Sequence, residues 1–406
     1  ALAHNRISVL KSLKIRITDS STPKKLTIRV RSEWAANDRS PFKETEFTLD
    51  APSAATAVEV APVDQVQLSD IALVDLEEKA PATLILELTD DLGRHQIVRQ
   101  DVDVFARDQW LRAEEYTVIT AAFVQPNNPD VNRVLKLAGE ILKASGNPGL
   151  SGYQDIKSGQ HHRIAEAIFT ALQTFVTTYI NPPASFATVG QKLRPIDRVL
   201  DEKQGTCLDL ACAYASCLEQ AGLHPIIYLV RGHAFAGYIA DEGHLSSPVI
   251  NEWSAIQSLI DSKLLVAVET VCITDDKTFE QAKSQASFRL VERDAVGQMM
   301  ESIIDVALAH RQGILPLPAR VVRDNVITVV IDNGPKSPPV IERRDATTRK
   351  LLPESVPARV QAWKNSLLDL SFRNRLLNLR PDRYGMKILL PVGRLGEIED
   401  RLNNEE

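Results

Sequence analysis

Apolar and polar residues alternate along the first quarter of the chain. Two of the clearest runs are Leu26–Val30 and Leu84–Leu88, in which every second side chain is apolar. A period of two predicts half-buried β-strands, and turn signals such as Asn-Asp-Arg-Ser-Pro separate the runs. The pattern predicts an all-β segment over residues 1–107, with strands at Val9–Ile17, Leu26–Val30, Phe47–Leu49, Val58–Val60, Leu84–Leu88 and Ile97–Phe105.

Short strands in this number and at this spacing are typical of an immunoglobulin-like β-sandwich, and we expect that fold for residues 1–107. No cluster of histidine, cysteine and acidic residues marks a site within it. Its expected role is packing or partner binding, and the fold alone does not decide between them.

Helix periodicity begins near Trp110 and continues, with interruptions, to about residue 314. Apolar residues recur every three or four positions, and strand-like runs such as Leu265–Val271 lie between the helical stretches. We therefore expect an α+β domain over residues 108–314, with helices over residues 131–142, 164–179, 279–290 and 296–310.

Proline marks the end of this domain. Between Leu315 and Pro357 lie seven of the 22 prolines, interrupted by the strand-like run Asn325–Ile331. We interpret residues 315–357 as an extended connector. Residues 358–406 are expected to be the helical start of a further domain.

Composition excludes several classes of protein. The chain has 44% hydrophobic and 25% charged residues and a net charge of −6. No apolar run approaches the ~20 residues that a membrane helix needs, and the sequence does not begin with a signal peptide. The four cysteines lack metal-binding spacing, so we expect reduced thiols and no bound metal. We also expect no other cofactor, no membrane partner and a cytoplasmic location.

The candidate chemistry is concentrated between Asp201 and Ala240. A Gly-Thr turn precedes Cys207, and apolar residues then follow at helical spacing as far as Leu218. Cys207 is therefore expected on the first turn of a helix, where free backbone N–H groups and the helix dipole favour a thiolate. Asp209 acts in the opposite direction, because a nearby carboxylate disfavours a second negative charge.

Two further residues complete a nucleophilic arrangement. His233 begins an alternating, strand-like run, and an imidazole can accept the proton of a thiol. Glu269 lies in an otherwise apolar strand, where a carboxylate is costly without a partner, so it is the candidate that orients His233. The alternatives are a buried helix cysteine and a core histidine with satisfied hydrogen bonds.

Residues 150–290 resemble the transglutaminase-like superfamily of papain-type folds. The likeness is carried by Gly205-Thr206-Cys207-Leu208-Asp209-Leu210 and Gly232-His233-Ala234-Phe235, with Val268-Glu269-Thr270 in place of the usual Asp-Pro-Thr. It implies a thiol nucleophile at Cys207, a base at His233 and an orienting acid at Glu269. The 36 residues between His233 and Glu269 exceed the usual short hairpin, and we interpret Asp241–Lys263 as an inserted loop or short helix.

Gln191 is the candidate for a side chain that stabilises an oxyanion. Papain-like enzymes use a glutamine upstream of the cysteine, because an amide N–H can hold the developing negative charge. The position of Gln191 differs from the papain one, and the alternative is a glutamine on the surface.

A second resemblance lies near the end of the sequence. The stretch Trp363–Leu379, WKNSLLDLSFRNRLLNL, looks like the signature helix of an uncharacterised domain at the front of large bacterial superfamily 1 helicases linked to phage defence. The likeness implies that this chain is the N-terminal part of a longer protein, whose helicase or nuclease part is a partner. No G-x-x-x-x-G-K-[ST] loop occurs in these residues.

These observations leave two main hypotheses. The first is a cysteine-dependent hydrolase, with a protease as the favoured form and a protein as its substrate. The second is a catalytically inactive transglutaminase-like module that docks a partner or regulates the helicase. A closed groove over Cys207 would favour the second hypothesis.

Arg373 and Arg375 generate a third, weaker hypothesis, contact with nucleic acid. The stretch from Ile341 to Arg383 contains ten Lys and Arg but five Asp and Glu. The alternative interpretation is a solvated helix face and a linker.

If the segment binds nucleic acid, fluorescence anisotropy with labelled DNA should show an affinity that falls steeply with salt concentration. The affinity should fall further when both arginines are replaced by alanine. Replacing Lys136 and Lys143 is the control. Salt-insensitive or absent binding contradicts the hypothesis.

Overall fold

The chain folds as a mixed α+β protein. The computed structural model describes residues 1–329, with gaps at 9, 11–12, 17–22, 35–39, 52–57, 60–65, 70–72, 74–75, 148–159, 185–189, 241–243, 295–296 and 324–325. The chain divides into two units, Ala1–Leu352 and Pro353–Glu406, and every described residue belongs to the first.

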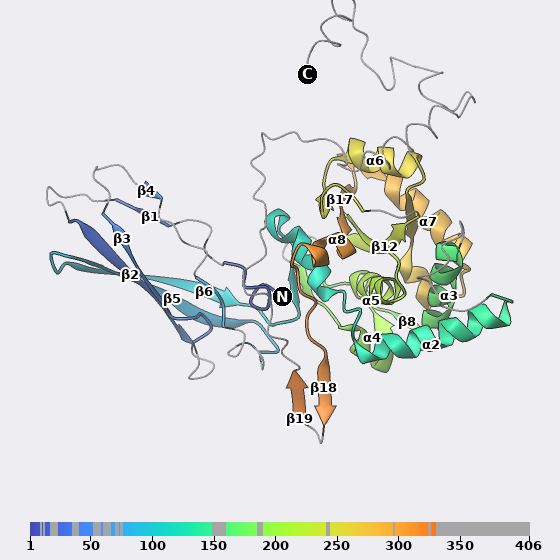
Figure 1. Cartoon of the computed structure of the whole chain (residues 1–406), viewed down its shortest axis with the longest axis horizontal. Coiled ribbons are helices and arrows are strands. Elements are labelled where there is room, and N and C mark those ends of the chain that lie inside the picture. The colour runs from blue at the N-terminus through green and yellow to red at the C-terminus, as the bar shows by residue number, and fades with distance from the viewer. Residues whose placement is uncertain are drawn as a thin grey trace, which may run out of the picture. The chain divides into compact units, whose positions relative to one another are not determined.

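The N-terminal part is built on a four-stranded antiparallel sheet (Figure 1). Its order is β3-β2-β5-β6, and a separate two-stranded pair, β1 with β4, accompanies it. The strands are β1 Lys14–Ile15, β2 Lys25–Trp34, β3 Thr45–Asp50, β4 Val58–Glu59, β5 Ala80–Asp90 and β6 His95–Val104.

Alternation along these strands separates a core face from a charged face. Ile28, Val30 and Leu84 are buried in one apolar cluster with Phe42 and Val66. On the opposite face, cross-strand ion pairs such as Arg31–Glu87 (2.7 Å) occupy the surface. The strands predicted at 26–30, 47–49 and 84–88 are confirmed; of the run predicted at 9–17, the structure describes only residues 14–15 as strand.

The second part contains a five-stranded antiparallel sheet in the order β13-β17-β11-β12-β14. Its strands are β11 Pro225–Val230, β12 His233–Ile239, β13 Val249–Ile250, β14 Leu265–Val268 and β17 Met300–Asp305.

Helices cover both faces of this sheet. Alternate residues of β11 point to opposite sides: Ile227 joins the cluster containing Cys212 of α5 (Cys207–Gln220), and Tyr228 joins the cluster containing Ile256 and Ala286. Ile256 belongs to α6 (Trp253–Asp261) and Ala286 to α7 (Phe279–Val291). The sheet therefore separates α5 from α6 and from the later part of α7, whereas Phe279 and Ala282 at the start of α7 share an apolar cluster with α5.

Helices α2, α3 and α4 pack against α5 in a shared apolar cluster. Helix α2 begins where predicted, because Asn128 caps it by accepting a hydrogen bond from Asp130 N (3.1 Å). The bounds of these helices and of the remaining elements complete the description. They are β7 Gln109–Leu111, η2 Glu114–Phe123, α2 Pro129–Ala144, α3 Gln160–Phe175, β8 Thr178–Tyr179, β9 Gly190–Lys192, α4 Ile196–Glu202, β10 Gln204–Gly205, η4 Thr270–Thr274, β15 Arg293–Asp294, β16 Gly297–Gln298, α8 Val306–Arg311, β18 Arg320–Arg323 and β19 Val326–Val329.

Several sequence-based expectations need correction. The helix predicted over residues 296–310 is wrong for its first part: Met300–Asp305 forms strand β17, and only Val306–Arg311 is helical. The reason is tertiary: Met300, Ile303 and Ile304 fit helical spacing, but β17 pairs with β11 and β13 inside the sheet. Trp110 lies in strand β7, and Tyr179 lies in β8 rather than on the face of α3.

The interpreted insertion Asp241–Lys263 forms strand β13 and helix α6 among its described residues. The strand predicted at 325–331 is present as β19, paired with β18. No helix in the described ranges combines the length and the apolar character that crossing a membrane requires.

Gly237 permits the close approach of β12 to β14, so we predict that Gly237→Ala destabilises the protein. A Cβ atom at this position would lie 1.9 Å from the carbonyl oxygen of Val266. Because that atom is backbone in a paired strand, the loss of unfolding free energy should exceed about 2 kcal/mol, measured by urea denaturation. Ala234→Gly on the same strand is the control and should cost about 1 kcal/mol. Equal stability of Gly237→Ala and wild type would contradict the packing described.

Candidate active site

Cys207 is the first residue of α5, as its sequence context predicts. Thr206 caps the helix: its hydroxyl accepts a hydrogen bond from Asp209 N (3.3 Å), and Asp209 Oδ2 accepts one from Thr206 N (2.9 Å). This reciprocal capping box fixes the first turn of the helix. The thiol of Cys207 is therefore held at a helix N-terminus, where the local dipole favours a negative charge.

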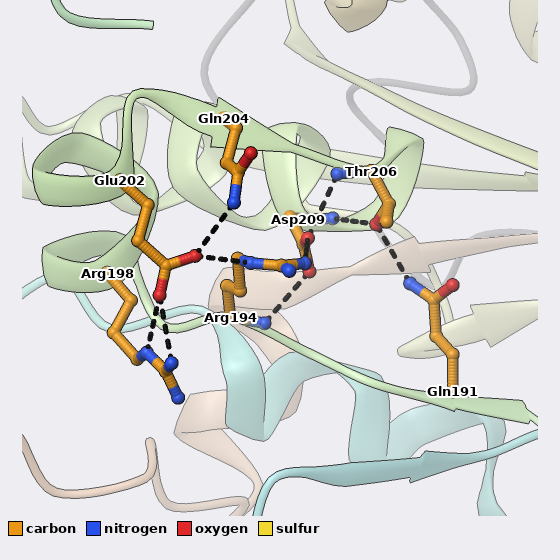
Figure 2. A network of polar contacts seen from close by, with 7 residues as sticks. All are labelled: Gln191, Arg194, Arg198, Glu202, Gln204, Thr206 and Asp209. Atoms are coloured by element: carbon orange, nitrogen blue, oxygen red, sulfur yellow. Dashed lines mark hydrogen bonds and ion pairs between the residues drawn. The ribbon is translucent and has the colours of Figure 1, made fainter. Parts of the chain in front are cut away.

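A polar network anchors this turn to the preceding segment (Figure 2). Arg194 approaches Asp209 through its backbone N–H (2.9 Å to Oδ1) and its guanidinium (3.2 Å to Oδ2). The same guanidinium donates to Glu202 (2.9 Å), which also accepts from Arg198 and Gln204. The network thus joins α4 and the segment before it to the first turn of α5.

Asp209 has a structural role that its sequence position does not reveal. Burial raises the pKa of Asp209, against the lowering effects of the N–H groups of Thr206 and Arg194 and of the Arg194 charge. Its negative charge is offset by Arg194, so the expected repulsion of a Cys207 thiolate is reduced.

His233 is positioned by a tight turn between two strands. Gly232, with a φ of 75°, lies in the turn that joins β11 to β12, and Val230 pairs with His233 in the register. Glycine adopts this left-handed conformation at little cost. His233 therefore begins β12 at the end of the sheet.

Glu269 follows directly after β14, the strand next to β12. Its carboxylate oxygens lie 3.1 and 2.9 Å from His233 Nε2. One of them accepts a hydrogen bond from Val271 N (3.3 Å), and Arg289 Nε lies 3.6 Å from the other. The carboxylate fixes the imidazole so that Nδ1 is left for another partner.

The thiol of Cys207 lies beside this imidazole. Burial opposes the charged imidazolium, but hydrogen bonds to Cys207 and Glu269 and the charges of both groups raise the pKa of His233 to about 9. At neutral pH the imidazole is thus protonated beside the sulfur. The structure thus hydrogen-bonds His233 to Glu269 and places the thiol of Cys207 close enough to raise the pKa of the imidazole.

Tyr179 is a further site residue, and the sequence reasoning missed it. Burial, together with the proximity of Cys207 and the charge of Glu269, raises the pKa of Tyr179 to about 12. Strand β8 pairs with β10 so that Tyr179 lies opposite Gly205. The signal was the β-branched run Thr177-Thr178 before it, which favours a strand over a continued helix.

The site is closed to solvent. Cys207 has no exposed surface, and the side chains of His233 and Glu269 are 15% and 5% exposed. A carbonyl group can reach the sulfur only after a local rearrangement.

Gln191 is buried, so the interpretation as a surface glutamine is wrong. It lies in β9, and its Nε2 donates to the hydroxyl of Thr206 (2.9 Å), the residue that caps α5 (Figure 2). Its contact is thus with the turn that positions Cys207. The oxyanion role of Gln191 stays a prediction.

The other cysteines differ from Cys207 in their surroundings. Cys212, Cys217 and Cys272 are buried free thiols, as expected, and burial raises the pKa of all three, to about 11 for Cys272. Among the described residues no group of three or more His, Cys, Asp or Glu could hold a metal ion. Arg373 and Arg375 lie outside the described residues.

Comparison of the chain with models of known protein families, with curated proteins and with solved structures found no match.

We predict that the pairing of His233 stabilises the protein below neutral pH and loses this effect at alkaline pH. The folded pKa of about 9 lies above the ordinary value of 6.5, so the contribution is complete below about pH 6.5 and disappears as pH rises through about 9. It should be on the order of 2–3 kcal/mol.

The measurement is the difference in unfolding free energy between wild type and His233→Ala at about pH 6 and about pH 10, which lie below the ordinary pKa and above the raised one. The difference should be larger at pH 6. His95→Ala, at an exposed position, is the control and should show no such change. A pH-independent difference for His233 would contradict the ion pair.

Proposed function

We propose that the protein is a cysteine-dependent hydrolase that acts through a thiol acyl-enzyme. The observation that carries this proposal is the hydrogen bond of His233 to Glu269 together with the thiol of Cys207 beside the imidazole, at the start of α5. A thiol at a helix N-terminus, a protonated imidazole and an orienting carboxylate are the groups that such chemistry needs.

In the first half-reaction, the Cys207 thiolate attacks an amide carbonyl carbon and forms a C–S bond. The backbone N–H groups at the start of α5 stabilise the oxyanion. His233 donates its proton to the amine nitrogen, the C–N bond breaks, and the amine leaves. The products are a thioester at Cys207 and a neutral imidazole.

In the second half-reaction, His233 removes a proton from water as the oxygen adds to the thioester carbonyl. The C–S bond then breaks, and the carboxylic acid leaves. The thiolate and the imidazolium are restored. Glu269 holds the imidazole through Nε2 in both steps, so that Nδ1 is the nitrogen that gives the proton to the amine and later accepts one from water.

We further propose that residues 108–314 form a transglutaminase-like, papain-type domain and residues 1–107 an immunoglobulin-like one. The order of cysteine on a helix, histidine on a strand and acid after the next strand supports the first assignment. The substrate in this proposal is a polypeptide and water is the second nucleophile. The setting is the N-terminal part of a bacterial, helicase-containing antiphage protein in the cytoplasm.

One observation favours the alternative, a catalytically inactive module that docks a protein or regulates the helicase. Cys207 has no exposed surface, and Tyr179 lies close to it. A closed site of this kind could retain the buried polar chain for structure alone.

Thiol alkylation distinguishes the two functions. We predict that iodoacetamide at pH 6 labels Cys207 at least about tenfold faster than Cys212, Cys217 or Cys272, because only Cys207 has a protonated imidazole beside it. Peptide mass spectrometry reports each cysteine separately, so the three other thiols are internal controls. His233→Ala should remove the difference.

The paired measurement is cleavage of a denatured protein substrate by wild type and by Cys207→Ala. Labelling of Cys207 together with cleavage that the variant lacks supports the hydrolase. Labelling of Cys207 no faster than the other three contradicts the enzyme for this chain and favours the docking module.

A further inference from the structure

Strand β6 is a long, regular edge of the N-terminal sheet. It stands at one end of the order β3-β2-β5-β6, and its register with β5 runs from Ala80 opposite Val104 to Thr89 opposite His95 without a bulge. It contains no proline and no lysine. Proteins usually protect an edge with short strands, bulges, proline or charged side chains; β6 lacks the first three, and its charges are of both signs, Arg99 against Asp101 and Asp103.

The backbone of β6 presents a defined set of hydrogen-bonding groups at this edge. Asp90 N donates to Arg94 O (3.1 Å), so this pair is hydrogen-bonded across the hairpin. Hydrogen-bonded and non-bonded pairs alternate in an antiparallel ladder, so the odd-numbered residues of β6 direct their N–H and C=O groups away from β5. Pro81, which has no N–H, lies opposite the odd-numbered Asp103 and fits this alternation.

The side chains of β6 divide between the two faces of the sheet. Val98 and Val102 lie on the same face as Leu84, Leu86 and Leu88 of the core. Val98 is nevertheless 49% exposed, because it lies at the open edge. Arg99 and Asp101 lie on the charged face, where each has a surface partner, Glu33 and Thr83.

We infer that β6 pairs antiparallel with β6 of a second copy of this chain, in a register centred on Gln100. In this register Arg99 lies opposite Asp101 of the second copy, and by symmetry Asp101 lies opposite its Arg99. Both residues direct their backbone groups outward, so they form hydrogen-bonded pairs. On the other face Val98 lies opposite Val102 of the second copy.

Charge selects this register from its neighbours. Centring the pair on Arg99 or on Asp101 places like charges directly opposite, which destabilises a sheet. Centring it on Val98 removes the Arg99–Asp101 pairing and shortens the ladder. The opposite edge, β3, is only six residues long and continues from Phe42, which already bridges to Leu68.

Two four-stranded sheets would become one continuous sheet across the contact. Addition of a single strand buries little area, so the dimer is expected to be weak, with a Kd in about the micromolar range. This inference concerns the N-terminal sheet and is independent of the proposed hydrolase.

The test is sedimentation velocity of the full chain over a series of concentrations up to about ten times the expected Kd. Wild type should show a monomer–dimer equilibrium. Arg99→Asp and Asp101→Arg should each raise the Kd about tenfold or more, because like charges then face each other twice. The double variant R99D/D101R restores both pairs and should return the Kd to within about threefold of wild type.

The charge swap also separates the interface from an effect on folding, because the double variant carries both substitutions. Glu46→Arg on β3, at an exposed position of the other edge, is the matched control and should leave the Kd unchanged. A chain that stays monomeric over the whole series overturns the inference. So do single variants that associate like wild type, or a double variant that fails to recover.

Discussion

The buried carboxylate of Asp209 is the constraint on which the arrangement at Cys207 depends. A fully buried carboxylate costs several kcal/mol unless charges and hydrogen bonds compensate it. Asp209 is compensated by the N–H of Thr206 in its own helix turn and by Arg194 from the segment before α4. The helix can bury its first turn only when these partners are in place. The contacts that compensate Asp209 therefore also hold the helix turn that carries Cys207.

The sheet positions the other two residues of the site, His233 and Glu269, through the pairing of its strands. His233 and Glu269 stand at the ends of adjacent strands, so their separation is set by the backbone ladder between β12 and β14. A side chain at a strand end can project beyond the sheet and meet a helix N-terminus. The imidazole is consequently fixed by Glu269 on Nε2, and the helix places the thiol of Cys207 near the same ring.

Much of this arrangement could be predicted from the sequence, because it is encoded locally. The Gly-Thr turn before Cys207, the Gly-His turn into β12 and a lone acid after an apolar strand each have a local physical cause. Strand β17 could not be recognised, since its apolar residues Met300, Ile303 and Ile304 also fit helical spacing and its pairing with β11 and β13 decides between helix and strand. Likewise, the burial of Gln191 and the contact of Tyr179 depend on two- and three-residue strands whose partners are distant in sequence.

Closure of the site and its chemistry have the same physical origin. Excluding water strengthens the interaction between the imidazolium and the sulfur, but it also removes the path by which a substrate arrives. Tyr179 lies opposite Gly205, two residues before Cys207, so displacement of strand β8 would disturb the turn that places the nucleophile. Rotation of the Tyr179 side chain would leave that pairing intact. The pairing of β8 with β10 thus ties Tyr179, a neighbour of Cys207, to the turn that begins α5.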